Sequence, residues 1–461
     1  MDIKIFGAAK EVTGSCFSVS VTDEKVLVDC GMFQGDEELE KLNYEKFPFD
    51  PTEYDALLLT HAHLDHCGRI PFLINSGFKG KIYATDATKE LAFIVMADSA
   101  KIAIGNAEEE NKRRLKENLP QIKPVYNMDD VTKAMKLFVI VEYDKLTKVT
   151  ENISAKFYNA GHILGSSSVQ VVVNDEKKEK VAVFSGDLGQ SQSILMKSIE
   201  PITNADYVFM ESTYGDRLHQ NLDGRRKKLA QIINETHAKG GKLMIPVFAI
   251  ERTQEVLYYI GELMAEEVIP KMPVFLDSPM ATRATAVFKK FPRYFNEEVR
   301  SKLKETNDVF NFPELEITMK RAASIAINSI KTPCIVLAGS GMCSGGRIKH
   351  HIANNIEDEN NTLLFVGYQV KGTLGNLIQS GAKSISLLGK EVKISARIET
   401  EEGFSAHADK DGLLEWLDNF KGKPKVFLIH GDEDQQIALE KTLKAKGFEC
   451  HIPSLNEELA L

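Results

Sequence analysis

The stretch Thr60-His61-Ala62-His63-Leu64-Asp65-His66 holds three imidazoles and one carboxylate within six residues. It directly follows residues 56–59, an apolar run typical of a buried strand. Neutral imidazole and carboxylate are standard zinc ligands, and a strand end can direct several of them to one point. A histidine-rich turn can be incidental, but this spacing after a buried strand predicts a metal site.

Further candidate ligands lie in three distant segments of the chain. Each one follows an apolar strand and stands beside a glycine, which lets the backbone approach closely. They are His162 in AGHILG, Asp187 in FSGDLG and His430 in FLIHGD. Any one of them alone could be a structural polar residue, whereas together with the histidine run they form a consistent set. We interpret Cys67 as a buried thiol beside the site and not as a ligand.

Composition excludes several classes of protein. Hydrophobic residues make up 43% of the 461 residues and charged residues 27%, which indicates a globular protein and not a disordered one. The longest apolar run, residues 91–97, is far shorter than the roughly 18 residues of a membrane span. The amino terminus has no signal-peptide pattern, and the six cysteines form no CxxC pair. We therefore expect a cytoplasmic protein that does not associate with membranes.

The chain length favours two or three domains. Short strands dominate the first part, and after Glu211 the pattern changes to repeated strand, polar loop and helix, which indicates a parallel α/β domain. We predict one domain, residues 1–211 and 391–461, split by an inserted domain at 212–390. The insertion carries 24 Lys/Arg against 18 Asp/Glu, so a local basic groove is compatible with the net charge of −9.

With these motifs in place, the sequence resembles the metallo-β-lactamase superfamily and, within it, the β-CASP nucleases. The matching residues are, in chain order, Asp29, the run His61 to His66, His162, Asp187, Glu211 in ESTYG, His407 in SAHAD, and His430. The resemblance implies an αββα metallo-β-lactamase sandwich with an inserted parallel α/β β-CASP domain. It is similar in layout to the nuclease subunit of the cleavage and polyadenylation specificity factor and to ribonuclease J, without KH or extra carboxy-terminal domains.

The resemblance also implies two zinc ions and a division of their ligands. One zinc is assigned to His61, His63 and His162, the other to Asp65, His66 and His430, with Asp187 bridging both. Asp29 is then expected to orient a ligand or the bridging water. His407 becomes the candidate proton donor to the leaving oxygen, held and charged by Glu211. A metal-activated water as nucleophile implies products with a 5′-phosphate and a 3′-hydroxyl.

Three residues of the insertion are candidate substrate contacts. The loop AGSGMCSGG, residues 338–346, follows a strand and precedes a helix, so its amides could hold a phosphate. Its resemblance to the β-CASP segment that grips nucleic acid points to Ser340 and Gly341. Arg252, at the start of a helix, is a candidate phosphate clamp. An ordinary strand-to-helix turn is the alternative interpretation of the loop.

Several functions are compatible with part of this pattern. Small-molecule hydrolases of the superfamily lack the insertion and the residues matched by Glu211 and His407. DNA-repair members of the β-CASP group typically have valine where this chain has His430, so histidine favours RNA. A scaffold without activity would be expected to lack ligands, and every ligand is present. The expected partners are RNA and, as one option, a second copy of the chain; endonuclease and exonuclease action both remain open.

Overall fold

The computed structural model describes residues 1–175, 178–190, 193–219, 222–367, 369–401 and 404–461. Contacts divide the chain into two units. Unit 1 contains Met1–Ser193, Lys197–Leu218 and His407–Leu461, and unit 2 contains Ile194–Met196 and His219–Ala406. Each unit has its own sheets and core, and each is described separately. The exact domain bounds expected from the sequence, with an insertion at 212–390, stay a prediction.

Two seven-stranded sheets form the centre of unit 1, in the orders β22-β1-β2-β3-β4-β5-β6 and β21-β20-β11-β10-β9-β8-β7. The strands of the first sheet are β1 (Asp2–Ile5), β2 (Phe17–Val21), β3 (Glu24–Val28), β4 (Ala56–Leu58), β5 (Lys81–Ala84), β6 (Phe138–Ile140) and β22 (Glu458–Ala460). Those of the second are β7 (Thr147–Lys148), β8 (Ile153–Asn159), β9 (Ser167–Asp175), β10 (Lys178–Phe184), β11 (Tyr207–Glu211), β20 (Lys425–Ile429) and β21 (Cys450–His451).

The two sheets of unit 1 enclose one hydrophobic core, whose buried residues come from both sheets. β4 is apolar and buried along its whole length because it lies between the parallel strands β3 and β5. In the second sheet the rings of Phe184, Phe209 and Phe427 stack in series, with successive centroids 4.7 Å apart. These apolar strands fix the positions of the polar residues that follow them.

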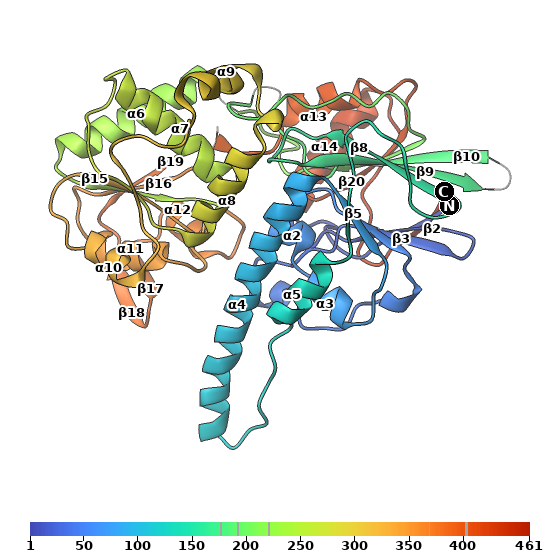
Figure 1. The fold of residues 1–461 in the computed structure, drawn as a ribbon, viewed down its shortest axis with the longest axis horizontal. Coiled ribbons are helices and arrows are strands. Elements are labelled where there is room, and N and C mark those ends of the chain that lie inside the picture. Colours follow the sequence, from blue (N-terminus) through green and yellow to red (C-terminus); the bar gives the residue numbers. More distant parts are fainter. Residues whose placement is uncertain (176–177, 191–192, 220–221, 368, 402–403) are drawn as a thin grey trace. The chain divides into compact units, whose positions relative to one another are not determined.

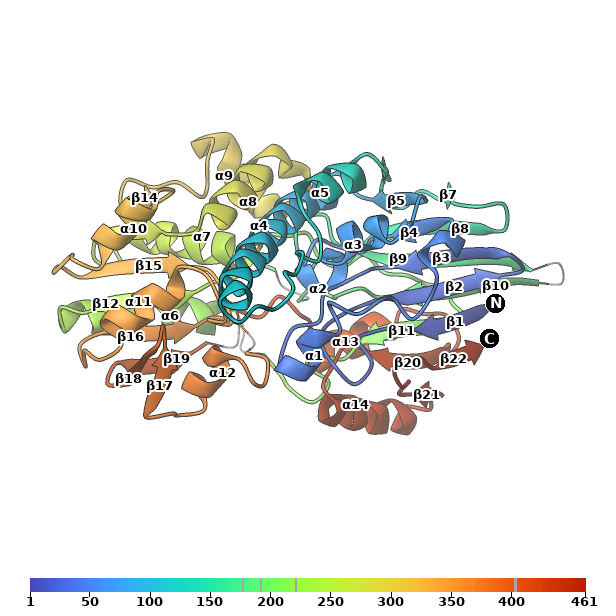
Figure 2. The ribbon, with the colours of Figure 1, turned by 90° about the horizontal axis from the view of Figure 1, so that it is seen from below.

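Helices cover both outer faces of the pair of sheets (Figure 1, Figure 2). One layer contains α2 (Leu64–Cys67), α3 (Ile70–Asn75), α4 (Asp86–Lys116) and α5 (Met128–Met135). The other contains α13 (Lys410–Leu417) and α14 (Glu433–Ala445), which pack through Trp416 and Leu439 on β11 and β20. The short helix α1 (Glu37–Lys41) and a 3-10 turn (Pro51–Glu53) lie in the connection between β3 and β4. The predicted αββα sandwich is confirmed.

The long helical region expected from residue 86 to about 136 is interrupted. α4 ends at Lys116 and α5 begins at Met128. Pro120 and Pro124 lie between them, and proline cannot supply the backbone donor that a helix requires. Asn127 then starts α5 with a capping box. Among the described residues, no helix combines the length and the apolar composition that crossing a membrane requires.

Unit 2 contains a six-stranded sheet in the order β14-β13-β15-β12-β16-β19, in which neighbouring strands run parallel. Its strands are β12 (Lys242–Pro246), β13 (Val274–Leu276), β14 (Leu315–Ile317), β15 (Cys334–Ala338), β16 (Thr362–Phe365) and β19 (Arg397–Thr400). Its helices are α6 (Leu222–Ala238), α7 (Arg252–Ala265), α8 (Pro279–Lys290), α9 (Glu297–Thr306), α10 (Arg321–Ile327), α11 (Ile348–Asn355) and α12 (Leu374–Gln379).

Two smaller elements complete unit 2, a hairpin of β17 (Ser384–Leu387) and β18 (Lys390–Lys393) and a 3-10 turn (Pro292–Tyr294). The alternation of strand and helix that the sequence predicted is confirmed, because each crossover between parallel strands contains a helix. The short strand β19 follows the hairpin and joins the sheet of unit 2 through its pairing with β16.

Candidate metal centre and active site

The candidate site residues of unit 1 lie where several strands end. β10, β11 and β20 are parallel neighbours, so Asp187, Glu211 and His430 meet at one edge of the second sheet. β8 runs in the same direction, since it is separated from β10 by the antiparallel strand β9, and it carries His162 to that edge. The facing sheet supplies residues 61–66 directly after β4.

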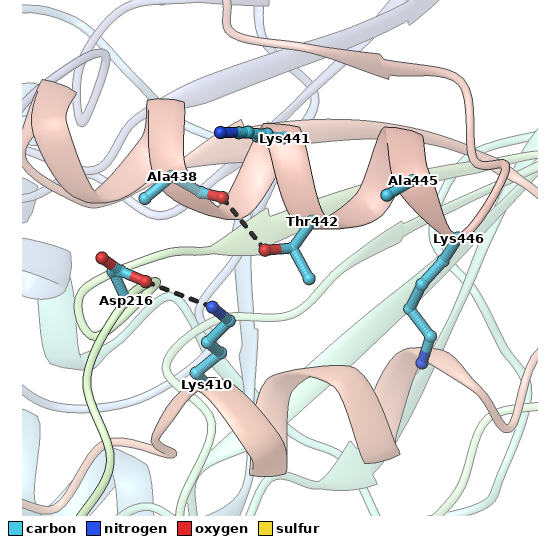
Figure 3. A pocket seen from close by; sticks show the side chains of 7 residues that line it. All are labelled: Asp216, Lys410, Ala438, Lys441, Thr442, Ala445 and Lys446. Carbon is cyan, nitrogen blue, oxygen red and sulfur yellow. Dashed lines mark hydrogen bonds and ion pairs between the residues drawn. The ribbon is translucent and has the colours of Figure 1, made fainter.

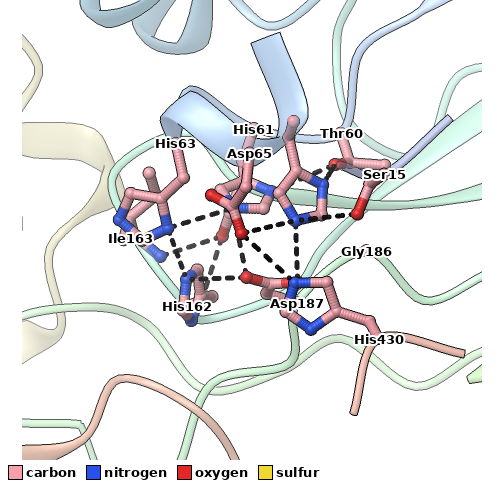
Figure 4. Close-up of polar contacts among 12 residues, drawn as sticks. Ser15, Thr60, His61, His63, Asp65, His162, Ile163, Gly186, Asp187 and His430 are labelled. Atoms are coloured by element: carbon pink, nitrogen blue, oxygen red, sulfur yellow. Dashed lines mark hydrogen bonds and ion pairs between the residues drawn. The ribbon is translucent and has the colours of Figure 1, made fainter. Parts of the chain in front are cut away.

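Four residues form the first group of potential ligands (Figure 4). His63 Nδ1 lies 3.2 Å from His61 Nε2 and 3.1 Å from His162 Nε2. Asp187 Oδ2 lies 3.3 Å from His61 Nε2 and 3.4 Å from His162 Nε2. Ligand atoms at the usual distance from a tetrahedral zinc ion are about 3.3 Å from one another. The four donors therefore have the spacing of a tetrahedral metal site.

A second group consists of Asp65, His66 and His430. His430 Nε2 lies 3.3 Å from Asp65 Oδ2, and His66 Nε2 lies 3.1 Å from Asp187 Oδ1. Asp187 thus directs one carboxylate oxygen to each group. Its Oδ1 is buried and accepts no hydrogen bond from the described residues. A buried carboxylate oxygen without a donor fits a metal ligand, because leaving it unpaired is costly.

The protonation of the first group also fits a metal site. Burial lowers the pKa of His61 to about 3 and that of His63 to about 4, and it holds the pKa of His162 well below its usual value. These three imidazoles are neutral near pH 7, so their lone pairs are available to a metal. Burial alone would lower the pKa of His66, but the carboxylates of Asp187 and Asp29 raise it well above its usual value, since they favour positive charge there.

Asp29 and Thr60 form a hydrogen-bonded support behind the histidines. Asp29 Oδ2 lies 2.7 Å from His66 Nδ1, and the carboxylate accepts hydrogen bonds of 2.8 Å from the backbone N–H and the hydroxyl of Thr60. The same hydroxyl lies 3.0 Å from His61 Nδ1. One carboxylate and one threonine therefore fix the ring orientation of two candidate ligands, as outer partners of metal ligands commonly do.

The sequence interpretation did not identify Thr60 or Thr213 as functional residues. Thr213 Oγ1 lies 3.2 Å from His430 Nδ1, so it holds this ring as Thr60 holds His61. Each threonine stands within two residues of a motif, Thr60 before His61 and Thr213 after Glu211. That proximity was the only signal, because the contact of Thr213 is made across two neighbouring strands, β11 and β20.

We expect Thr213→Val to weaken metal binding at the group that contains His430. Valine has a similar shape but removes the hydroxyl beside Nδ1, and losing such an outer partner typically costs about 10–100-fold in metal affinity or activity. Thr213→Ser, which keeps the hydroxyl, should bind metal almost normally. Titration with a competing chelator measures the difference. Equal metal affinity of the two variants would show that the contact has no positioning role.

His407 and Glu211 form a separate buried pair. His407 Nδ1 lies 3.0 and 3.1 Å from the two carboxylate oxygens of Glu211, which is fully buried and also accepts a 2.7 Å hydrogen bond from the Leu188 N–H. His407 Nε2 lies 3.8 Å from Asp187 Oδ2. Burial alone would lower the pKa of His407, but the carboxylates of Glu211 and Asp187 raise it to about 9. Without bound metal, this imidazole carries a proton at neutral pH.

The predicted substrate contacts Ser340, Gly341 and Arg252 all lie in unit 2. Ser340 follows β15, and its hydroxyl exchanges hydrogen bonds with the backbone of Gly345. Gly341 has no room for a side chain, because an added Cβ would lie 2.5 Å from the Phe248 ring. Arg252 is buried at the first position of α7 and forms an ion pair with Glu255. Contact of these three residues with substrate stays a prediction.

A surface hollow of unit 1 lies between α13 and α14 (Figure 3). It is lined by Asp216, Lys410, Ala438, Lys441, Thr442, Ala445 and Lys446. Lys410 Nζ is 3.1 Å from Asp216 Oδ1, so the hollow contains an ion pair at its edge. None of the residues predicted to act in binding or catalysis lines it, and the candidate site is the buried cluster around Asp187.

Three family models match successive parts of the chain. Residues 18–198 match the metallo-beta-lactamase superfamily domain, residues 253–378 the Beta-Casp domain, and residues 391–453 the Zn-dependent metallo-hydrolase RNA specificity domain. The last two models begin after residue 212 and near residue 391, where the sequence pattern changes.

Similar proteins match over almost the whole chain. Ribonuclease TTHA0252 of Thermus thermophilus is 39% identical over 99% of this chain and 99% of its own length. An RNase J-like protein of Methanocaldococcus jannaschii is 32% identical over 97% of both chains, and the transcription termination factor FttA of Methanosarcina mazei is 32% identical over 96% of this chain and 69% of its own length. A crystal structure of a protein of unknown function from Enterococcus faecalis has a similar fold, with a TM-score of 0.53 at 14% identity over 100% of this chain and 99% of that chain.

Proposed function

This chain belongs to the metallo-β-lactamase superfamily and to its β-CASP branch, and from that membership we propose that it is a zinc-dependent ribonuclease. The observation that carries the proposal is the position of Asp187, whose two oxygens face separate groups of ligands beside the His407–Glu211 pair. RNA as the substrate is supported by the matched RNA specificity domain and by the name of the relative that aligns over 99% of its length.

The donor set fits two zinc ions. His61, His63 and His162 would hold one ion, Asp65, His66 and His430 the other, and Asp187 would bridge them. Imidazole and carboxylate are the ligand types that zinc prefers, and neither group contains a cysteine. When bound, such a pair of ions supplies an activated water and stabilises the charge that develops on a phosphoryl oxygen.

The residues of the chain supply proton transfer and positioning. Glu211 holds His407 Nδ1, so the opposite ring nitrogen, Nε2, is directed towards the candidate ligands. From Nε2 the imidazole donates a proton to the leaving oxygen, and the buried Glu211 carboxylate stabilises the charged ring. The products then carry a 5′-phosphate and a 3′-hydroxyl, because water and not the ribose 2′-hydroxyl attacks phosphorus.

Other substrate classes fit this chain less well. A small-molecule hydrolase of the superfamily does not need unit 2 or the His407–Glu211 pair. A DNA nuclease of the same fold is the second candidate, and His430, with its Nε2 3.3 Å from Asp65, favours the RNA-processing members. Basic residues of unit 2 are the expected contacts with phosphate. A role in RNA processing or decay, a cytoplasmic location and the choice between endonuclease and 5′ exonuclease action stay proposals.

The purified protein is expected to cleave RNA and to contain close to two zinc ions per chain. RNAs labelled at one end and bearing 5′-hydroxyl, monophosphate or triphosphate groups measure the activity, and a chelator should abolish it because the ligands hold no activated water without metal. A ladder from one end indicates an exonuclease, and discrete internal products indicate an endonuclease. Rapid hydrolysis of a β-lactam or a thioester with intact RNA, or full RNA cleavage in strong chelator, would contradict the proposal.

A further inference from the structure

The second half of α4 and the segment that follows it form a projection from unit 1. The buried residues of α4 extend from Ala87 to Ala100, and Ala107 is the last of them. Figure 1 shows the helix continuing beyond the neighbouring elements of unit 1 before the chain returns. We call residues 101–123 the arm. Asn111 ties the two strands of the arm together, since its side chain exchanges two hydrogen bonds with the backbone of Ile122.

The arm exposes more apolar surface than a solvated helix requires. Ile102 and Leu115 are 58% and 59% exposed, and Leu119 and Ile122 are 43% and 39% exposed. Ion pairs within a helix can explain exposed charges, but they do not explain exposed aliphatic side chains. Apolar side chains grouped on a projecting element are typical of a surface that binds another protein.

The charges of the arm have a two-fold order that identifies the partner. Glu108-Glu109-Glu110 precedes Asn111, and Lys112-Arg113-Arg114 follows it. Two copies of this helix in antiparallel orientation, with a two-fold axis at Asn111, place every glutamate of one copy opposite a basic residue of the other. Such self-complementarity is the condition for an isologous contact between identical chains.

The apolar residues obey the same symmetry. Ile102 lies on one side of Asn111 along the arm, and Leu115 and Leu119 lie on the other. An antiparallel pair therefore brings Leu115 and Leu119 of one copy towards Ile102 of the other. Ile102, Glu109 and Arg113 also share one exposed face of the helix, because they are seven and four residues apart. The contact would have a charged centre and an apolar region at each end.

The ion pairs within the arm do not prevent this association. Arg113 lies 2.6 Å from Glu110 and 2.9 Å from Glu117, and Arg114 lies 2.9 Å from Glu110. Arg113 and Glu117 are about half exposed, with 56% and 48% of their side chains open to solvent. Exposed pairs of this kind contribute little stability, so these side chains can exchange partners at small cost.

We propose that the arm is the interface of a homodimer, in which two α4 helices pair in antiparallel orientation about Asn111. The proposal does not depend on the ribonuclease assignment, because no residue of the arm belongs to the candidate active site. Wild-type protein should therefore sediment as a dimer in analytical ultracentrifugation, and the dimer should weaken at high salt as the charged centre is screened.

Charge reversal within the arm tests both the surface and the symmetry. A basic arm carries E108K, E109K and E110K, and an acidic arm carries K112E, R113E and R114E. Each variant alone should be a monomer, because like charges then face each other, whereas an equimolar mixture should form a heterodimer. The same pairing cannot be produced by loss of folding, since both variants must be folded to associate. Leu115→Asp should weaken the dimer without altering zinc content or RNA cleavage per chain.

Reversal of two exposed glutamates on α9, E297K and E298K, provides the matched control, since their side chains are 73% and 72% exposed in unit 2. This control should leave the dimer intact. A monomeric wild-type protein would overturn the proposal. Unchanged dimers of the two arm variants, or a mixture of them that stays monomeric, would overturn it as well.

Discussion

The Asp187→Ala variant is expected to lose bound metal and ribonuclease activity together. Asp187 is the only residue that faces both groups of candidate ligands among the distances described above, with Oδ2 3.3 Å from His61 Nε2 and Oδ1 3.1 Å from His66 Nε2. Its removal takes one ligand from each zinc ion and the group that fixes their relative position. The loss should exceed the roughly 100-fold effect of removing an outer partner of a metal ligand.

Zinc content after gel filtration and RNA cleavage, measured on the same sample, test this expectation. Asp216→Ala is the matched control, because the Asp216 side chain is 56% exposed and lies in unit 1 outside the ligand groups. The control should keep its zinc and its activity. An Asp187→Ala protein that retains two zinc ions and cleaves RNA normally would show that Asp187 bridges no metals. Circular dichroism excludes general unfolding as the cause of a loss.

The sequence predicted the candidate ligands well because each follows an apolar strand directly. A strand such as β10 or β20 has a recognisable apolar pattern, so the residue after it must lie at the sheet edge. The structure brings all seven predicted metal ligands into one cluster, together with Glu211 and His407. Their roles as ligands and proton donor stay predictions that the variants described here test.

Contacts between sheets or between neighbouring strands were not accessible from the sequence. The hydrogen bond of Thr213 to His430 depends on the register of β11 with β20, which no local pattern encodes. The ion pair of Arg252 with Glu255 lies within one helix, but burial of Arg252 follows from the packing of unit 2 and not from its sequence neighbours. The same applies to β19, whose short sequence does not reveal which sheet it joins.

The His407→Ala variant is expected to keep both zinc ions while its turnover falls by roughly 10²–10⁴, the range for losing a general acid. His407 contacts Glu211 through Nδ1, and its Nε2 is 3.8 Å from Asp187, farther than the nearest candidate ligands. Removing it should therefore leave the metals in place and remove only the proton donor. A zinc-replete, folded His407→Ala protein that cleaves RNA at nearly the wild-type rate would eliminate His407 as the acid.

Glu211→Gln separates the charge of the pair from its geometry. Glutamine can still orient the imidazole, but it no longer stabilises the protonated ring, so the pKa of His407 should fall. Because the acid acts in its protonated form, activity is lost as pH rises through this pKa. The alkaline limb of the pH–rate profile should therefore move to lower pH in Glu211→Gln, with a milder loss of turnover than in His407→Ala. An unshifted limb would mean that the rate does not depend on the proton of His407, because a purely structural role for Glu211 predicts lower stability without a change in the profile.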